Sequence, residues 1–85
     1  MSERFAKNLV KERRASGLSQ EELAFRAAIH RTQISLLENG GRLPRFETLI
    51  KLAGALEVSV ATLTEGIVWK PIVSVTGGLE VSDEE

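Results

Sequence analysis

The stretch from Leu18 to Gly40 constrains the fold of this chain most, because two helix-start signals occur in it in close succession. Ser19 is a favourable N-cap, and Glu22 follows three residues later. Leu18 and Leu23 flank these two residues, which completes the pattern of a capping box with a hydrophobic staple. The pattern predicts that a helix begins directly after Ser19.

The second start signal has the same spacing. His30 occupies a cap position, Gln33 follows three residues later, and Ile29 and Ile34 form the expected staple. Helices this short are not stable alone in water, so they must pack against each other and against the rest of the chain. The apolar positions that would do so are Leu23, Ala24 and Ala27 in the first helix and Ile34 and Leu37 in the second.

Helical periodicity with start and stop signals predicts three further helices, so the expected fold class is all-α with five helices. The first three expected helices cover residues 2 or 3 to 15, 20 to 27 and 31 to 39. The fourth begins at Pro44 or just after it and ends at about residue 56. A short fifth begins at Val58 and Ser59 and runs through Thr64. The residues expected to face inward in the first and fourth helices are Phe5, Ala6, Leu9, Leu49, Leu52, Ala53 and Leu56.

The chain changes character after residue 65, which divides it into a helical domain (1–65) and a C-terminal extension (66–85) with an acidic end at 82–85. The β-branched and aromatic residues of 67–69, 72–75 and 79–81 predict two or three short strands, with a hairpin at Gly77 and Gly78. A lone hairpin is marginal in water. The extension must therefore either pack on the helices or pair with a second chain.

Charge is distributed unevenly along the 85 residues, although the net charge is only −1. Residues 1–46 carry nine lysines and arginines against five glutamates, a net charge of +4, and residues 47–85 carry −5. The basic half coincides with the two-helix stretch, as an electrostatic footprint on nucleic-acid phosphates requires.

Other classes of protein are not indicated. The chain has no cysteine and one histidine, which leaves no disulfide and no metal-ligand spacing. It also has no glycine-rich phosphate loop and no nucleophile–base set, so neither an enzyme nor a cofactor is expected. No apolar run approaches the ~20 residues of a membrane span. The first residues lack the apolar core of a signal peptide, and the expected location is the cytoplasm.

The chain from about Phe5 to Thr64 resembles the phage-repressor/Cro-like (XRE-type) family of helix-turn-helix transcription regulators. The residues that carry this resemblance are Leu18, Ser19, Gln20, Glu21, Glu22, Leu23, Ala24, Ala27, Ile29, Arg31, Ile34, Ser35, Leu37, Glu38 and Gly40, then Pro44, Glu47, Thr48, Leu49, Leu52, Ala53, Ala55, Leu56, Val58, Ser59 and Leu63. The resemblance implies a five-helix repressor-like domain that places the second helix of the motif in the DNA major groove. It further implies a repressor or controller protein that binds an inverted-repeat operator as a homodimer.

The same resemblance implies which residues contact bases, since the first residues of such a helix reach base edges. Arg31 is the strongest candidate, because a guanidinium can bridge O6 and N7 of guanine. The alternative is a phosphate-bound or solvent-exposed arginine. Leu36 stands where the family often has a polar residue, and it either touches a thymine methyl group or packs beside the first or fourth helix. The complete expected set is Arg31, Thr32, Gln33, Ser35 and Leu36.

Four further residues are expected to contact phosphates, which position the protein without specifying sequence. Gln20 opens a helix, where free N–H groups and the positive dipole end favour an anion; the alternative is a helix-start residue that faces solvent. Asn39, Arg42 and Arg45 surround the loop after the DNA-reading helix.

Three structural expectations also come from the resemblance. Arg13 and Glu38 match a pair that forms an interior salt bridge in relatives, where it would orient the DNA-reading helix. Ala28 stands where the family commonly has glycine, and Glu57 where glycine or asparagine is frequent. A left-handed backbone at either residue would be strained, so the turn is expected to bear that strain or adopt a variant geometry.

Double-stranded DNA and a second copy of the chain are the expected partners. The expected dimer contacts are Ile67, Trp69, Ile72 and Val73, with Trp69 as the anchor because tryptophan is favoured at interface centres. Packing of Trp69 onto its own helices is the alternative. A different class of function is an antitoxin that masks a toxin, through the C-terminal extension, and also represses its own operon.

Overall fold

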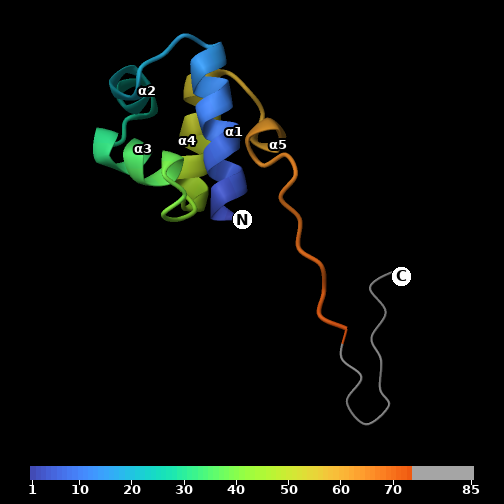
Figure 1. Cartoon of the computed structure of the whole chain (residues 1–85). Coiled ribbons are helices and arrows are strands. Elements are labelled where there is room, and N and C mark those ends of the chain that lie inside the picture. Colours follow the sequence, from blue (N-terminus) through green and yellow to red (C-terminus); the bar gives the residue numbers. More distant parts are fainter. Residues whose placement is uncertain (74–85) are drawn as a thin grey trace.

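The computed structural model describes residues 1–73, and this part of the chain contains five helices (Figure 1). These are α1 (Ser2–Ala15), α2 (Gln20–Ala27), α3 (Arg31–Glu38), α4 (Phe46–Leu56) and α5 (Val60–Leu63). The all-α prediction is therefore confirmed. The third helix ends one residue earlier than expected, with Asn39 as its C-cap, and the fourth begins two residues after Pro44.

The first start signal forms as the sequence predicts. The hydroxyl of Ser19 accepts a hydrogen bond from the backbone N–H of Glu22 at 3.0 Å, and the Glu22 carboxylate accepts one from the backbone N–H of Ser19 at 2.8 Å. These bonds stabilise the ionised carboxylate, so they lower the pKa of Glu22 below its ordinary value. A complete capping box thus fixes the start of α2.

The second capping box was predicted wrongly. His30 is the N-cap of α3, but its side chain makes no capping hydrogen bond, and Gln33 contributes only its backbone N–H, which bonds to the His30 carbonyl at 2.9 Å. N-capping favours the small oxygen acceptors of serine, threonine, aspartate and asparagine, and an imidazole is a poor substitute. The start of α3 therefore depends on packing more than on a cap.

One apolar core joins all five helices. The six largest residues that are fully buried are Phe5, Leu9, Leu23, Ile34, Leu52 and Leu63, and Leu18, Ala24, Ala27, Leu37, Ala53 and Leu56 complete the cluster. Full burial of one such large side chain stabilises the fold by about 1.5–3 kcal/mol. The residues predicted to face inward from helical periodicity are therefore those that build the core, with Leu49 packed against it and half-buried.

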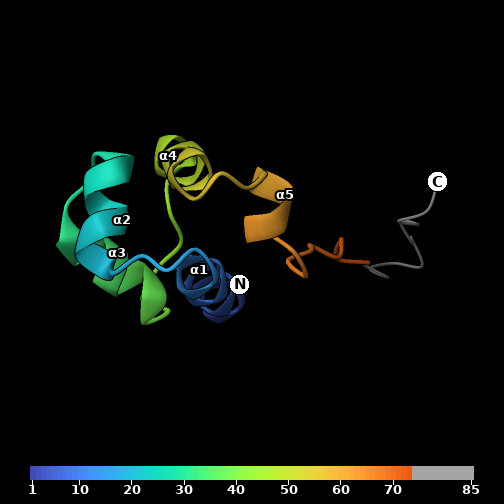
Figure 2. The same ribbon diagram turned by 90° about the horizontal axis from the view of Figure 1, so that it is seen from above.

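The packing order places α3 at one side of the molecule and α5 at the other. Helix α3 packs on α1 and α2, whereas α5 packs on α1 and α4. The view from above shows α2 and α3 together on one side, α1 and α4 in the middle and α5 opposite (Figure 2). Residues 67–73 continue outward from α5, away from α3 (Figures 1 and 2). None of the described helices is long and apolar enough to cross a membrane.

A buried asparagine attaches α5 to α1. The Asn8 side-chain amide donates hydrogen bonds to the carbonyl oxygens of Leu63 and Glu65, both at 2.9 Å. Leu63 is the last residue of α5 and Glu65 follows it, so these carbonyls have no partner within the helix. Arg4 adds a third bond from its guanidinium to the Glu65 carbonyl at 3.1 Å. Helix α5 is only four residues long and has one buried residue, Leu63, so it depends on these bonds as well as on apolar packing.

No strand forms between residues 67 and 73, so the predicted strand at 67–69 is wrong. The backbone N–H of Ile67 bonds back to the Thr64 carbonyl at 3.0 Å, and Val68 and Trp69 are exposed. Strand propensity reflects pairing and burial, and the described segment has neither. The remaining expectations for the C-terminal extension lie outside the described residues. They are the hairpin at Gly77 and Gly78, the strand at 79–81, the second half of the strand at 72–75 and the acidic end.

The left-handed conformation is kept at both positions where glycine is usual. Ala28 has φ of 57° and Glu57 has φ of 59°, and each is the C-cap of the preceding helix. The turn between α2 and α3 therefore keeps the left-handed geometry and bears its steric cost, rather than adopting a variant.

Candidate nucleic-acid interface

One flank of α3 is exposed, and it carries the residues expected to read bases. Ile34 and Leu37 hold the opposite flank in the core. Arg31 and Thr32 are exposed on the first turn, while Gln33 and Ser35 are half-buried. Leu36 is 40% exposed, so it is not buried beside another helix, and its methyl groups remain accessible from outside. The flank combines hydrogen-bond donors and acceptors, one cation and one apolar side chain, which is a set that can read base edges.

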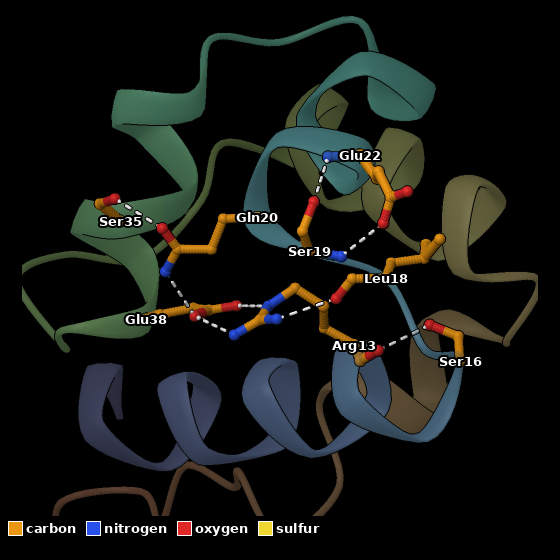
Figure 3. A network of polar contacts seen from close by, with 8 residues as sticks. All are labelled: Arg13, Ser16, Leu18, Ser19, Gln20, Glu22, Ser35 and Glu38. Carbon is orange, nitrogen blue, oxygen red and sulfur yellow. Dashed lines mark hydrogen bonds and ion pairs between the residues drawn. The ribbon is translucent and has the colours of Figure 1, made fainter.

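The orientation of α3 is fixed from behind by an ion pair (Figure 3). Arg13 on α1 donates from Nε to Glu38 Oε2 at 2.6 Å and from Nη2 to Glu38 Oε1 at 3.0 Å. The side chains are 14% and 6% exposed, so water screens the pair weakly. The hydrogen bond to Glu38 raises the pKa of Arg13. The ion pair expected between these two residues is therefore present, and it joins the first helix to the end of α3.

Further hydrogen bonds extend this ion pair to α2 and to the exposed flank of α3 (Figure 3). Arg13 also donates to the Leu18 carbonyl at 2.9 Å, just before α2. The amide nitrogen of Gln20 donates to Glu38 Oε1 at 2.8 Å, and the Ser35 hydroxyl donates to Gln20 Oε1 at 3.1 Å. We call the chain Arg13–Glu38–Gln20–Ser35 the relay. It connects three helices and ends on a residue of the exposed flank.

The Gln20 side chain is thus not simply a helix-start residue in solvent. One of its two amide hydrogens goes to Glu38, and the other has no acceptor among residues 1–73. Gln20 is also the first residue of α2, where backbone N–H groups point outward. The geometry is compatible with a phosphate contact from this residue.

The remaining expected phosphate contacts gather around the loop that follows α3. A groove of about 390 Å³ lies between the α2–α3 turn, this loop and α4. Arg42, Arg45 and Lys51 line it together with His30 and Gln33, and Glu47 is the acidic residue of the lining. Both arginines are exposed, as is Asn39 at the end of α3. The structure therefore brings Arg42 and Arg45 together at one edge of α3, while Gln20 lies at the other edge.

The expected dimer contacts differ in their exposure. Trp69 is 71% exposed, and Ile72 and Val73 are exposed as well. The alternative that Trp69 packs onto its own helices is therefore wrong in this structure. Ile67, by contrast, is half-buried and packs against the core, so only part of its side chain is open to a second chain.

Two features of the structure had not been predicted. Asn8 is buried and holds α5 through hydrogen bonds. The sequence does not indicate this contact, because a polar residue next to apolar positions of a helix does not identify its distant partner. Phe25 and Phe46 are exposed, on α2 and at the start of α4. An aromatic residue is normally taken as core, so only the position of Phe25, next to Arg26 and opposite the buried face of α2, could have indicated exposure.

Comparison with known proteins agrees with this geometry. Residues 9–63 match the helix-turn-helix family. The control protein C.SmaI of Serratia marcescens is 41% identical over 63 residues, which are 74% of this chain and 75% of that protein. The uncharacterized HTH-type transcriptional regulator YqaE of Bacillus subtilis is 36% identical over 62 residues, 73% of this chain but only 53% of that protein.

Solved structures give the same result for the fold. The restriction-modification controller protein C.AhdI from Aeromonas hydrophila superposes with a TM-score of 0.71 at 35% sequence identity. The match covers 73% of this chain and 94% of that one. The family match over residues 9–63 contains the whole candidate interface.

Proposed function

This chain belongs to the helix-turn-helix family of DNA-binding transcriptional regulators, and from that premise we propose that it is a sequence-specific regulator of the controller type. In this proposal α3 enters the major groove. Arg31, Thr32, Gln33, Ser35 and Leu36 contact bases, and Gln20, Asn39, Arg42 and Arg45 contact phosphates.

The observation that carries the proposal is the exposed flank of α3, braced from behind by the Arg13–Glu38 ion pair. A helix that reads bases must be open on one side and held rigidly on the other, since base readout depends on fixed hydrogen-bond geometry. The described C-terminal residues lead away from this flank, so they leave it open (Figure 1). Exposed cations beside α3 then supply the attraction to phosphates that every DNA sequence offers.

The regulator acts as a homodimer on an inverted repeat in this proposal. One α3 reads only a short half-site, and a two-fold dimer doubles the contact area with half-sites about one helical turn apart. The exposed side chains of Trp69, Ile72 and Val73 support a role for the C-terminal segment in that dimer, because exposed apolar side chains that occur together are typical of interaction sites. The position of the segment, opposite α3, leaves both DNA-reading helices of a dimer free.

The antitoxin function is not favoured. The relatives described above are named as transcriptional regulators and control proteins, and none of these names refers to a toxin or an antitoxin. The cytoplasm is the location in which such a regulator meets DNA.

Selection of duplexes from a random pool, followed by titration of the selected and random duplexes at increasing salt, tests the proposal. The expected result is an enriched inverted repeat and an affinity that falls steeply with salt, since each neutralised phosphate releases counterions. Failure to enrich any sequence, or binding that does not depend on salt, would overturn it. Arg31→Ala is a matched variant, because it removes an exposed side chain without touching the core.

A further inference from the structure

We propose that Ser35 determines specificity as a hydrogen-bond acceptor, because the relay consumes its only hydrogen and so restricts it to base edges that carry an amino group. The inference rests on the proposed function, since it concerns how α3 reads DNA. It goes beyond that function by naming the polarity of one contact and the bases that this polarity selects.

The polarity originates at Arg13. A guanidinium has only donors, and it places two of them on the two oxygens of Glu38. A carboxylate in such a pair is ionised and can only accept hydrogen bonds. Whatever else approaches Glu38 Oε1 must therefore donate a hydrogen.

The Gln20 amide is the group that approaches. Its nitrogen lies 2.8 Å from Glu38 Oε1. The reverse orientation would place the amide oxygen against a carboxylate oxygen, with two acceptors in contact and no hydrogen between them. Glu38 thus fixes the orientation of the amide, and the amide oxygen must point the other way, toward Ser35 (Figure 3).

Ser35 is the last residue of the relay. An amide oxygen only accepts, so the Ser35 hydroxyl must donate across the 3.1 Å that separates the two oxygens. A hydroxyl has one hydrogen and two lone pairs, and the hydrogen is now used. Toward DNA, Ser35 therefore presents lone pairs alone.

This polarity divides the bases into two classes. Adenine N6 and cytosine N4 carry amino hydrogens in the major groove, whereas guanine O6 and N7 and thymine O4 only accept. Phosphate oxygens also only accept. Ser35 should therefore favour a base with an amino group and should not bind the backbone while the relay is intact. The free amide hydrogen of Gln20, one residue along the relay, is the group left for a phosphate.

Ser35 is suitably placed for this role. It is half-buried and lies four residues after Arg31, which is about one turn farther along the same helix. Its hydroxyl is held by a side chain of α2, which in turn is held by the ion pair to α1. The contact is preorganised across three helices, which raises the discrimination that a single hydrogen bond can give.

Nucleobase analogues in the selected duplex test the inference directly. The base pair to alter is the position at which the base preference differs most between the unaltered protein and Ser35→Ala. The adenine or cytosine at this position is replaced by the same base without its exocyclic amino group. We expect the affinity of the unaltered protein to fall about three- to ten-fold, the range for one neutral hydrogen bond. Replacement of an adenine there by 7-deazaadenine, which keeps the amino group and loses N7, should have little effect.

Two variants separate the relay from the fold. Ser35→Ala should abolish the penalty for the missing amino group. Gln20→Leu removes the acceptor of the Ser35 hydrogen. The ratio of the affinities for duplexes that differ only at this base pair should then shift toward guanine or thymine. Ser16→Ala removes an exposed hydroxyl that donates to the Arg13 carbonyl and lies outside the relay, and it should keep the penalty of the unaltered protein. Thermal unfolding of each variant checks that it is folded.

Three results would overturn the inference while the proposed function stands. The first is a preference of the unaltered protein for guanine or thymine at this base pair, and the second is a penalty for the missing amino group that is equally large in Ser35→Ala. The third is an affinity that falls equally for all duplexes in Ser35→Ala and depends less on salt, which is the sign of a lost phosphate contact. Failure of the proposed function is distinct, because no duplex would then be enriched at all, and the inference would fall with it.

Discussion

Arg13 and Glu38 link α1 to the end of α3 through two hydrogen bonds, of 2.6 and 3.0 Å, in a site from which water is largely excluded. Apolar packing alone would allow α3 to rotate or slide by small amounts. The ion pair has one favourable geometry, so its main effect is to select one orientation of α3.

Loss of one member of this pair should be more harmful than loss of both. Arg13→Ala leaves the Glu38 carboxylate without its cation, and Glu38→Ala leaves the guanidinium and the Gln20 amide without an acceptor. Each should lower the free energy of unfolding by about 3 kcal/mol, the lower end for breaking a buried pair. The double variant Arg13→Met with Glu38→Leu should lose less than either, as measured by urea unfolding. A double variant that loses as much stability as either single variant would contradict this account.

Glycine at the two left-handed positions should stabilise the protein. Ala28 and Glu57 are exposed and have φ near +57° and +59°, a conformation that costs residues with a Cβ about 1–2 kcal/mol. Part of the gain is lost because glycine is more flexible in the unfolded chain, so each substitution should add about 0.5–1 kcal/mol in thermal unfolding. Gly17→Ala is the reverse control. Gly17 has φ of 75° with no atom near its added Cβ, so that variant should lose stability through backbone strain alone.

The sequence predicted the helices well because their determinants are local. The Ser19 capping box and the periodic leucines act within a few residues of one another, and the structure contains each of them. The same local rule failed at His30, where the spacing was right but the side chain was not a good cap. It also failed at 67–69, because a strand needs a partner that residue type alone does not supply.

The relay and the α5 clamp could not be predicted from local signals. Gln20 and Glu38 are far apart in the sequence, and Asn8 is farther still from Leu63. Such contacts exist only after the helices have packed. The resemblance to relatives did supply the Arg13–Glu38 pair, because it carries information about packing that periodicity does not.

Removal of the Asn8 clamp should release α5 selectively. Asn8→Ala leaves the Leu63 and Glu65 carbonyls without their buried donor, at a cost of about 1–3 kcal/mol. Hydrogen exchange should quicken at residues 60–65 more than in α2 or α3, because α5 is short and depends on these bonds. Unchanged exchange in α5 would show that the Asn8 bonds do not hold it.

Loss of Trp69 should weaken the proposed dimer without unfolding the helices. Trp69 is exposed in the single chain, so Trp69→Ala removes little intramolecular packing. Sedimentation should show that the Trp69→Ala dimer dissociates more readily than the dimer of the unaltered protein. The melting temperatures of the two proteins should be equal when they are compared at the same fraction of monomer. Phe25→Ala is a control, since Phe25 is also exposed but lies on α2, remote from the C-terminal segment. A dimer unchanged in Trp69→Ala excludes the anchor role.

Acid should open the start of α2 through Glu22. Bonding to Ser19 lowers the pKa of this carboxyl in the folded state, so its contribution to stability is complete above the ordinary value of 4.5. The contribution is lost as pH falls below that value and through the folded pKa. Glu22→Gln should therefore reduce the fall in stability below pH 4.5, as measured by thermal unfolding at several pH values.

The central claim is that the exposed flank of α3 reads DNA sequence, and the affinity of Arg31→Ala for selected and random duplexes tests it most directly. We predict a loss of about ten-fold or more on the selected duplex, equivalent to one base contact of about 1–3 kcal/mol, with a much smaller loss on random DNA. An equal loss on both duplexes, or none on either, would contradict the claim.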